Sequence, residues 1–474
     1  MSKLSIAVVV SGSLVMGFAI AGGLLFGPLG GEAEPVITGS ALLGFAAGWA
    51  LLAGLSMRWT NQPQRWAAVP AVYMGLAGAG LLVFAPTGET LNALGWVWPL
   101  TLLALVLWMM LQIRRHLHSW TRAWLLYPLI SIYAASALGG GYQTIRETMD
   151  RRLWEQSGSL VDVGGHRLYL SCSGNGGPTV ILESGLGETS AYWDAIATAV
   201  SSDTKVCIYD RAGRGGSDPA PMSLDGTGVA KELHALLANA NLSRPFILVG
   251  HSSGALYVRI FAELYPDEVV GVVLLDGQPA EVFTRLPNFP AFYRYFRRIS
   301  AVLPSFARVG VARMIYHADF ANLPTHVRDM QRASHSSVRS SRSLRDEFEA
   351  LPTTLEQAGS TSGFGDKPLI VVTAGRDAQT GWVALQNELP RLSTNSQHRV
   401  LPNATHMSII EGPDASDSIQ AIRDVVKTAI VLFCKDPALI PAPPAPATPT
   451  SMLHFGHEWG LPRVVPAPGY PSSG

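Results

Sequence analysis

The sequence is poor in cysteine and carries no excess of either charge. Its 474 residues include three cysteines, Cys172, Cys207 and Cys434, whose spacing fits neither a zinc site nor a dense disulfide framework. Lysine plus arginine and aspartate plus glutamate both number 35, so no net charge attracts nucleic acid. Basic runs interleaved with aromatic residues, which strand binding needs, are also lacking. We therefore expect no nucleic-acid partner.

Charged residues are scarce in the first 145 positions. Nine occur there, one before and eight between five stretches without Asp, Glu, Lys or Arg, which cover residues 6–26, 36–57, 67–85, 93–113 and 123–142. Each stretch runs to about 20 residues, the length of a helix that crosses a hydrocarbon core about 30 Å thick. The pattern predicts a membrane domain over residues 1–145 with about five transmembrane helices, and a linker over residues 146–159.

The few charges in this region predict an orientation. Arginines gather in the second and fourth linkers between the stretches, whereas the first and third linkers carry only glutamates. The positive-inside rule places the arginine-bearing linkers in the cytoplasm. With five spans, the residues after Tyr142 are then extracytoplasmic, although Arg146, Arg151 and Arg152 oppose this. The first stretch is longer than the apolar core of a signal peptide, which favours an uncleaved span.

Residues 160–438 change to short apolar runs separated by glycine turns and amphipathic segments. Seven runs are typical of strands: residues 168–171, 179–182, 205–209, 246–249, 269–275, 369–373 and 397–401. Several are continuously apolar, as in parallel strands buried on both faces. Their alternation with helical patterns predicts an α/β fold with a parallel sheet. The Pro- and Ala-rich residues 439–474 cannot bury a core, and we expect them to be disordered.

One pentapeptide, Gly250-His251-Ser252-Ser253-Gly254, has the Gly-x-Ser-x-Gly pattern. It follows a predicted strand and opens a predicted helix, which is the context that a nucleophile elbow requires. The glycines suit a sharp turn that side chains would crowd. The pattern predicts that Ser252 is a nucleophile rather than a capping residue, while His251 packs beside it.

A serine hydroxyl needs a base, usually an imidazole that a carboxylate orients. His406 follows the last predicted strand and is the expected base. Asp377 follows the strand at 369–373 and is the preferred acid, from the expected chain order Ser, Asp, His and from its proximity to His406. Asp276, at the end of the strand 269–275, is the alternative. Backbone N–H groups of Leu186, in a glycine-rich loop, and of Ser253 are expected to form the oxyanion hole.

Four motifs in this order carry a family resemblance: VILESGLGETSAYWDAI, VCIYDRAGRGGSDP, GHSSG and NATHMSIIEGP. From about residue 160 to 433 the chain resembles the α/β-hydrolase superfamily, in its esterase-like and peptidase-like group. The resemblance implies the triad, the oxyanion donors and a helical lid, expected over residues 279–365. Serine at the elbow argues against dehalogenase or epoxide hydrolase chemistry. Ser184-Gly185 departs from the His-Gly of many relatives.

The resemblance also implies that the strand at 168–171 neighbours the strand at 205–209, so Cys172 and Cys207 could form a disulfide. Together the patterns predict a membrane-anchored serine hydrolase that cleaves an ester or related acyl bond of a small-molecule or lipid-like substrate, with no cofactor and no metal. An aminopeptidase, thioesterase or acyltransferase would use the same residues. A binding module without catalysis is the alternative from another class.

Overall fold

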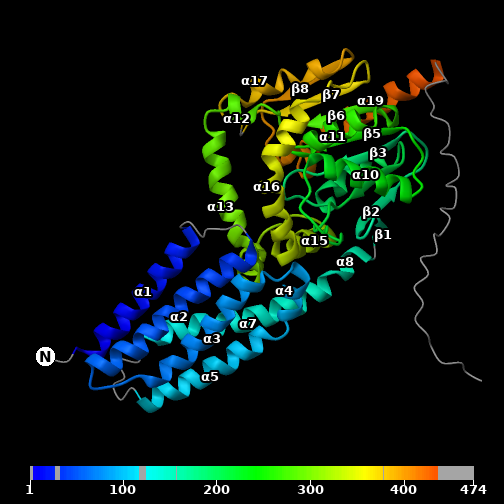
Figure 1. The fold of residues 1–474 in the computed structure, drawn as a ribbon. Helices are drawn as coiled ribbons and strands as arrows, with labels where there is room; N and C mark the ends of the chain where they lie inside the picture. Colours follow the sequence, from blue (N-terminus) through cyan, green and yellow to red (C-terminus); the bar gives the residue numbers. More distant parts are fainter. Residues whose placement is uncertain (1–3, 27–32, 117–123, 156, 377, 436–474) are drawn as a thin grey trace, which may run out of the picture. The chain divides into compact units, whose positions relative to one another are not determined.

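The chain forms a helical N-terminal region and an eight-stranded sheet flanked by helices (Figure 1). The structure is a computed structural model that describes residues 4–26, 33–116, 124–155, 157–376 and 378–435. The predicted tail, residues 439–474, and the preferred acid Asp377 lie outside the described residues. The N-terminal region and the sheet fall within the same compact unit.

The N-terminal region consists of long apolar helices joined by short connections. Its helices are α1 (Ile6–Phe26), α2 (Glu34–Trp59), α3 (Ala68–Phe84), α4 (Gly88–Leu94), α5 (Trp98–His116) and α7 (Tyr127–Asp150). The N–H of Leu4 donates to the carbonyl of Trp59 at 2.8 Å, so the start of α1 lies beside the end of α2. The two helices are therefore antiparallel neighbours.

The expected number of five membrane spans is wrong, judged by the length and the apolar content of the helices. In the described part of the chain, three segments are long and apolar enough to cross a membrane: Ile6–Leu25, Glu34–Trp59 and Arg65–Phe84. Helices α4 and α5 meet at a 43° bend and add a fourth span if the pair counts as one. Helix α7 is long enough, with 24 residues, but Gln143, Thr144 and its tyrosines dilute its apolar content.

Small residues allow α1 and α2 to pack closely. A Cβ added at Gly44 would lie 2.4 Å from the Cβ of Ala21, and one added at Gly17 would lie 3.0 Å from the Cα of Gly48. Such close backbone approach is typical of helix pairs in membranes. The core of the helical region is apolar, and its buried Trp49 donates to the hydroxyl of Tyr133 at 3.2 Å.

The sheet has the order β1-β2-β4-β3-β5-β6-β7-β8. Its strands are β1 (Ser159–Asp162), β2 (Arg167–Ser173), β3 (Thr179–Glu183), β4 (Val206–Tyr209), β5 (Phe246–His251), β6 (Val269–Leu275), β7 (Leu369–Ala374) and β8 (Ser396–Leu401). The pairs β1–β2 and β2–β4 are antiparallel and all the others are parallel. The seven predicted strands are therefore confirmed, and β1 is an additional edge strand.

Helices cover both faces of the sheet. Helices α10 (Gly226–Asn239) and α11 (Gly254–Leu264) pack on one face, while α9 (Asp194–Val200) and α19 (Ala415–Lys435) pack on the other. Continuously apolar strands such as β3 and β6 follow from this, because both of their faces are buried. The short helices α8 (Arg152–Glu155), α17 (Trp382–Gln386) and α18 (Ser408–Glu411) complete the fold.

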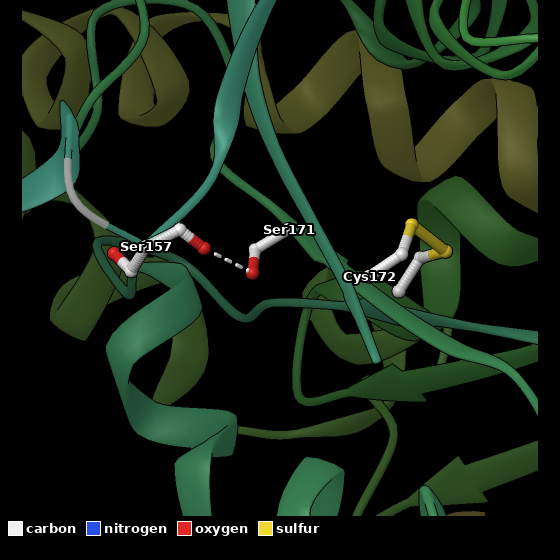
Figure 2. Close-up of a disulfide and its surroundings, with 4 residues drawn as sticks. Ser157, Ser171 and Cys172 are labelled. Atoms are coloured by element: carbon white, nitrogen blue, oxygen red, sulfur yellow. Dashed lines mark hydrogen bonds between the residues drawn. A yellow bond between two sulfur atoms is a disulfide. The ribbon is translucent and has the colours of Figure 1, made fainter. Parts of the chain in front are cut away.

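The predicted contact between Cys172 and Cys207 is confirmed as a disulfide (Figure 2). The two cysteines face each other across the antiparallel pair β2–β4, with their Cα atoms 4.1 Å apart. Next to it, the hydroxyl of Ser171 donates to the carbonyl of Ser157 at 2.6 Å (Figure 2). The bond therefore joins the antiparallel edge of the sheet to its parallel part.

Between β6 and β7 the chain leaves the sheet and forms five helices, in the range where the sequence predicts a lid. They are α12 (Val282–Arg285), α13 (Phe289–Arg308), α14 (Val311–Tyr316), α15 (Thr325–Ser336) and α16 (Val338–Gly359). Helix α16 packs against α10, α11 and α13, and α13 also contacts α2 of the N-terminal region. We call residues 282–359 the inserted helices.

Candidate active site

Ser252 stands in a tight turn between β5 and α11. Its φ of 52° lies in the left-handed region, where a residue other than glycine is uncommon. A Cβ at Gly250 would lie 2.7 Å from the N atom of Ala255, and one at Gly254 would lie 2.4 Å from the carbonyl oxygen of Glu183. The two glycines are therefore required by close backbone contacts. This is the strand, turn and helix geometry expected of a nucleophile elbow.

Asp276 and His406 form a direct pair. The Nδ1 atom of His406 lies 2.6 Å from Oδ2 of Asp276, and the Oδ1 atom of Asp276 accepts from the indole N–H of Trp382 at 2.9 Å. Asp276 itself has a φ of 42° and is almost fully buried. Its carboxylate is thus held on both oxygens and directed at the imidazole.

This pair supports the alternative acid. The sequence favoured Asp377 from chain order and proximity to His406, whereas among the described residues the carboxylate that contacts His406 is that of Asp276. Asp276 follows β6, which lies between β5 and β7 in the sheet. Backbone bonds fix its place beside the elbow, since the N–H of Ser252 donates to the carbonyl of Leu275 at 3.1 Å. Asp377 lies outside the described residues.

The contact with Asp276 also sets the tautomer of His406. An Nδ1–H that donates to a carboxylate leaves Nε2 as the free acceptor of the imidazole. The side chain of His406 is 38% exposed, and Ser252 is partly exposed. Both groups can therefore be reached from solvent, whereas Asp276 cannot.

The predicted oxyanion loop lies against the elbow. A Cβ at Gly185 would be 2.8 Å from the Cβ of Ser252, so only glycine allows this approach. In the described part of the chain, neither the N–H of Leu186 nor that of Ser253 has an acceptor. Two free donors next to a serine are what an oxyanion hole requires, although the N–H geometry toward a substrate stays a prediction.

A buried arginine holds the carbonyl groups of this loop. The guanidinium of Arg211 donates to the carbonyl oxygens of Ser184 and Gly185, both at 2.6 Å, and to the carboxylate of Glu183 at 2.6 Å. Its other partner is Glu347 of α16, at 2.9 Å. Burial opposes the charged form of Arg211, but the two glutamates outweigh it and raise its pKa well above the ordinary value.

A second buried pair lies beneath the imidazole of His406. His251 is fully buried, with Nδ1 2.8 Å from the carboxylate of Glu188 and Nε2 3.0 Å from the carbonyl oxygen of His406. The rings of His251 and His406 are 4.5 Å apart. Burial acts to lower the pKa of His251, but the carboxylate of Glu188 and the carbonyl of His406 raise it overall. The surroundings of His251 therefore favour its protonated form more than water does.

Sequence reasoning missed the roles of Glu188, Arg211 and Glu347. Arg211 was part of a motif that carried the resemblance, yet nothing near it in the sequence indicated its partners. Glu183 and Glu188 gave a signal, because a carboxylate in a predicted core strand or beside it must find a partner. Glu347 gave none, since it lies 136 positions from Arg211.

Metal ligation finds no support in the described residues, which contain no cluster of three His, Cys, Asp or Glu side chains that could hold an ion. The expected absence of a cofactor stays a prediction. A strained serine turn, a His–Asp pair and two N–H groups without an acceptor among the described residues lie at the carboxyl ends of parallel strands, where α/β proteins form their binding and active sites.

Comparison with known proteins names the family. Residues 178–413 match the α/β hydrolase fold family, and through them the chain belongs to it. A putative carbamate hydrolase, RutD, of Cronobacter turicensis is 35% identical over 103 residues, 22% of this chain and 38% of that protein. A probable transporter, efuK, of Hormonema carpetanum is 33% identical over 158 residues, 31% of this chain and 23% of that protein. The first curated relatives are matched over 23 to 46% of their own length.

Solved structures show likeness at low identity. An esterase from Thermogutta terrifontis is 21% identical, with a TM-score of 0.45 over 58% of this chain and 99% of that one. A mutant of a putative epoxide hydrolase from Pseudomonas aeruginosa is 15% identical, with a TM-score of 0.46 over 60% of this chain and 98% of that one. These similarities do not distinguish an esterase reaction from an epoxide hydrolase reaction for this chain.

Proposed function

We propose that the protein is a membrane-anchored serine hydrolase that cleaves an ester or related acyl bond. The observation that carries the proposal is the 2.6 Å contact between His406 and Asp276 beside the strained elbow of Ser252. A serine in an ordinary turn needs neither a left-handed backbone nor a neighbouring imidazole with a buried carboxylate behind it. The combination is what nucleophilic catalysis by serine requires.

The proposed reaction has two steps. The hydroxyl of Ser252 attacks the acyl carbonyl while Nε2 of His406 takes its proton, and the N–H groups of Leu186 and Ser253 hold the oxyanion. His406 then protonates the departing alcohol, which leaves an acyl group on Ser252. Water, activated by the same imidazole, releases the acid and restores the serine. Asp276 stabilises the imidazolium in both steps.

The substrate class follows from the surroundings of this site. A small-molecule or lipid-like acyl compound is the proposed substrate, because the domain follows helices that are apolar enough to span a membrane. An aminopeptidase, thioesterase or acyltransferase would use the same three side chains. We prefer ester cleavage to amide cleavage, because an alcohol departs more readily than an amine. The binding module becomes the better hypothesis if no turnover is found.

A fluorophosphonate probe tests the proposal on the full chain in detergent micelles. We expect one probe per protein on Ser252, and no labelling of Ser252→Ala. Turnover of short-chain aryl esters should fall by about 10⁴- to 10⁶-fold in Ser252→Ala and nearly as much in His406→Ala, because triad members act as a unit. A folded wild-type protein that takes up no probe would refute the enzymatic function.

We also propose that the hydrolase domain is extracytoplasmic. The buried carboxylate of Glu34, at the start of α2, contacts Arg308 and Arg342 of the inserted helices, so that end of α2 lies with the hydrolase domain. Arg58 lies at the opposite end of α2. This arrangement supports the proposal whatever the number of spans, since the positive-inside rule places the arginine end in the cytoplasm.

Labelling of intact cells with a membrane-impermeant maleimide tests the orientation. In a Cys434→Ser background, Met222→Cys in the hydrolase domain should react, whereas Arg115→Cys at the last turn of α5 should react only after lysis. Both native residues are exposed, so accessibility of the thiol itself is matched. The opposite pattern would place the hydrolase domain in the cytoplasm.

A further inference from the structure

Helix α16 touches the oxyanion loop through one carboxylate. Glu347 accepts from the N–H of Gly187 at 2.9 Å, and its two oxygens contact Arg211 at 2.9 Å and Arg214 at 3.0 Å. The three charged side chains are almost fully buried. Burial raises the pKa of Glu347, but the two arginines outweigh this and hold it below its ordinary value. The carboxylate is thus charged at neutral pH.

These contacts hold the loop on both sides of the proposed oxyanion donor. Leu186 lies between Gly185, whose N–H donates to Glu188 at 2.6 Å, and Gly187, whose N–H donates to Glu347. Because each neighbouring N–H has a buried carboxylate as its acceptor, the peptide of Leu186 has little freedom to turn. A donor is effective in catalysis only when it is aimed before the charge develops.

The same helix touches the N-terminal region five residues earlier. Arg342 donates from Nε to Oε2 of Glu34 at 2.5 Å, and Arg308 of α13 donates to Oε1 of the same carboxylate at 2.5 Å. Arg308 and Arg342 also donate to the carbonyl oxygens of Leu91 and Gly88, at 3.0 and 3.3 Å. The side chain of Glu34 is only 2% exposed.

The contact of Arg342 with Glu34 and the contact of Glu347 with Gly187 lie close together on the same helix, α16. Five helical residues span about 7.5 Å along the axis, and a helix of 22 residues transmits a displacement of one turn to the next. Buried ion pairs of this kind resist rearrangement, because separation would leave a charge without a partner. A shift of α16 at Arg342 would therefore move Glu347 and the N–H of Gly187 with it.

We propose that Glu347 is a positioning residue for the oxyanion loop, and that Glu34 of the membrane helices supports it through Arg342 and α16. The membrane region then contributes to the geometry of catalysis as well as to anchoring. This inference rests on the proposed function, since it assigns to Leu186 and Gly185 the oxyanion loop of a serine hydrolase.

The test measures the rate and the final stoichiometry of fluorophosphonate labelling separately, with the full chain in detergent micelles. Glu347→Gln should label about 10- to 100-fold more slowly, the loss expected for a misplaced oxyanion donor, while still reaching one probe per folded protein. Glu347→Asp keeps the charge that the arginines need but has a shorter reach. We expect it to recover thermal stability without recovering the rate.

The second variant probes the membrane end. Glu34→Gln should slow labelling by about threefold, the scale of coupling between linked sites, at unchanged stoichiometry. Glu356→Gln is the control, because Glu356 is an exposed carboxylate on α16 away from both contacts; it should label like wild type. Methionine or lysine at position 34 is avoided, since both would change packing as well as charge.

Three results are decisive. Wild-type labelling rates in both Glu347 variants, with only stability or stoichiometry reduced, would make Glu347 structural and overturn the proposal. Slow labelling of Glu347→Gln together with wild-type labelling of Glu34→Gln would overturn the membrane half of it. Wild-type protein without any labelling is a different failure, because it removes the proposed function itself.

Discussion

The apolar N-terminal helices and the hydrolase domain differ in how many charged groups they bury. The interior of the N-terminal region is mostly apolar, with Glu34 and Asp150 as its buried charges among the described residues, and α1 to α3 leave large apolar residues such as Val15, Leu76 and Phe84 exposed. The hydrolase domain instead buries charged groups at its centre, including Glu183, Arg211, Glu347, Glu188 and His251.

The difference shows where specificity resides in each region. Apolar helices in lipid need only fit one another, because any neighbouring surface is equally apolar. A buried charge needs one particular partner at one particular distance, because leaving it unpaired costs several kcal/mol. The hydrolase domain should therefore be sensitive to single polar substitutions, and the N-terminal helices, away from Glu34, to changes in side-chain size.

Among the variants that test this comparison, the largest effect is expected at the acid. Asp276→Asn should reduce turnover by about 10⁴-fold, because the amide would favour the wrong tautomer of His406. Asp377→Asn is the matched control and should stay within a few-fold of wild type. Steady-state hydrolysis of an aryl ester measures both. If Asp377→Asn is the crippled variant, the acid assignment returns to Asp377.

The disulfide gives the next largest effect, now on stability. Cys172→Ser should lower the free energy of unfolding by about 2 to 4 kcal/mol, because the bond closes a loop of 35 positions. Denaturant unfolding of the protein in micelles measures the loss. Cys434→Ser removes a thiol without opening this bond and serves as the control. Equal stabilities for the two variants would mean that the bond does not form in the mature protein.

A change of side-chain size should matter where α1 and α2 pack through small, uncharged residues. Gly44→Leu should cost about 1 to 3 kcal/mol, because its side chain would collide with Ala21 of α1. Gly54→Leu is the control, since a Cβ there meets no atom within 4 Å. Thermal unfolding in micelles measures both. Loss of stability in Gly54→Leu alone would contradict the observed pairing of α1 and α2.

The smallest expected effect is a dependence of the protein's stability on pH. The pKa of His251 is raised, so the stability from its protonation is complete below about pH 6.5 and is lost as pH rises through the raised pKa. Groups that face it are Glu188, His406, Asp276 and Glu411. The pKa of Glu188 is lowered, so its contribution is lost only in acid.

His251→Gln should therefore destabilise the protein more at pH 6 than at pH 9. We expect the difference in unfolding temperature between the variant and wild type to be larger at pH 6 by about 2 to 4 °C, the shift that 1 kcal/mol produces in a domain of this size. His326→Gln, which changes an exposed histidine, should show no such difference. An equal loss at both values of pH would mean that His251 is buried in its neutral form.

The sequence predicted the parts of this fold that have a local pattern. The strand 269–275 matches β6 residue for residue, because both of its faces are buried and its apolar run is continuous. The edge strand β1 escaped notice, since it is short, mostly exposed and without such a run. Helix α7 was counted as a span from the absence of charge in its first part, although its polar second part binds the inserted helices through Gln143 and Asp150.

The candidate site also contains residues that the sequence predicts and residues that it does not. Ser252 and His406 carry local motifs, and the structure places each in the context that the motif indicates. The acid could not be chosen from the sequence, because Asp276 and Asp377 each follow a strand, and only the path of the loops decides which one reaches the imidazole. The contact of Glu347 with the oxyanion loop could not be predicted from the sequence either, because Glu347 belongs to a helix far along the chain.

The positive φ value of Ser252 has a consequence for laboratory evolution of this protein. Glycine adopts that backbone more easily than serine does, so glycine at this position would relax the turn while it removes the proposed nucleophile. A library selected for heat resistance alone is expected to accumulate glycine at position 252. Screens for a more thermostable variant should therefore measure turnover in every round.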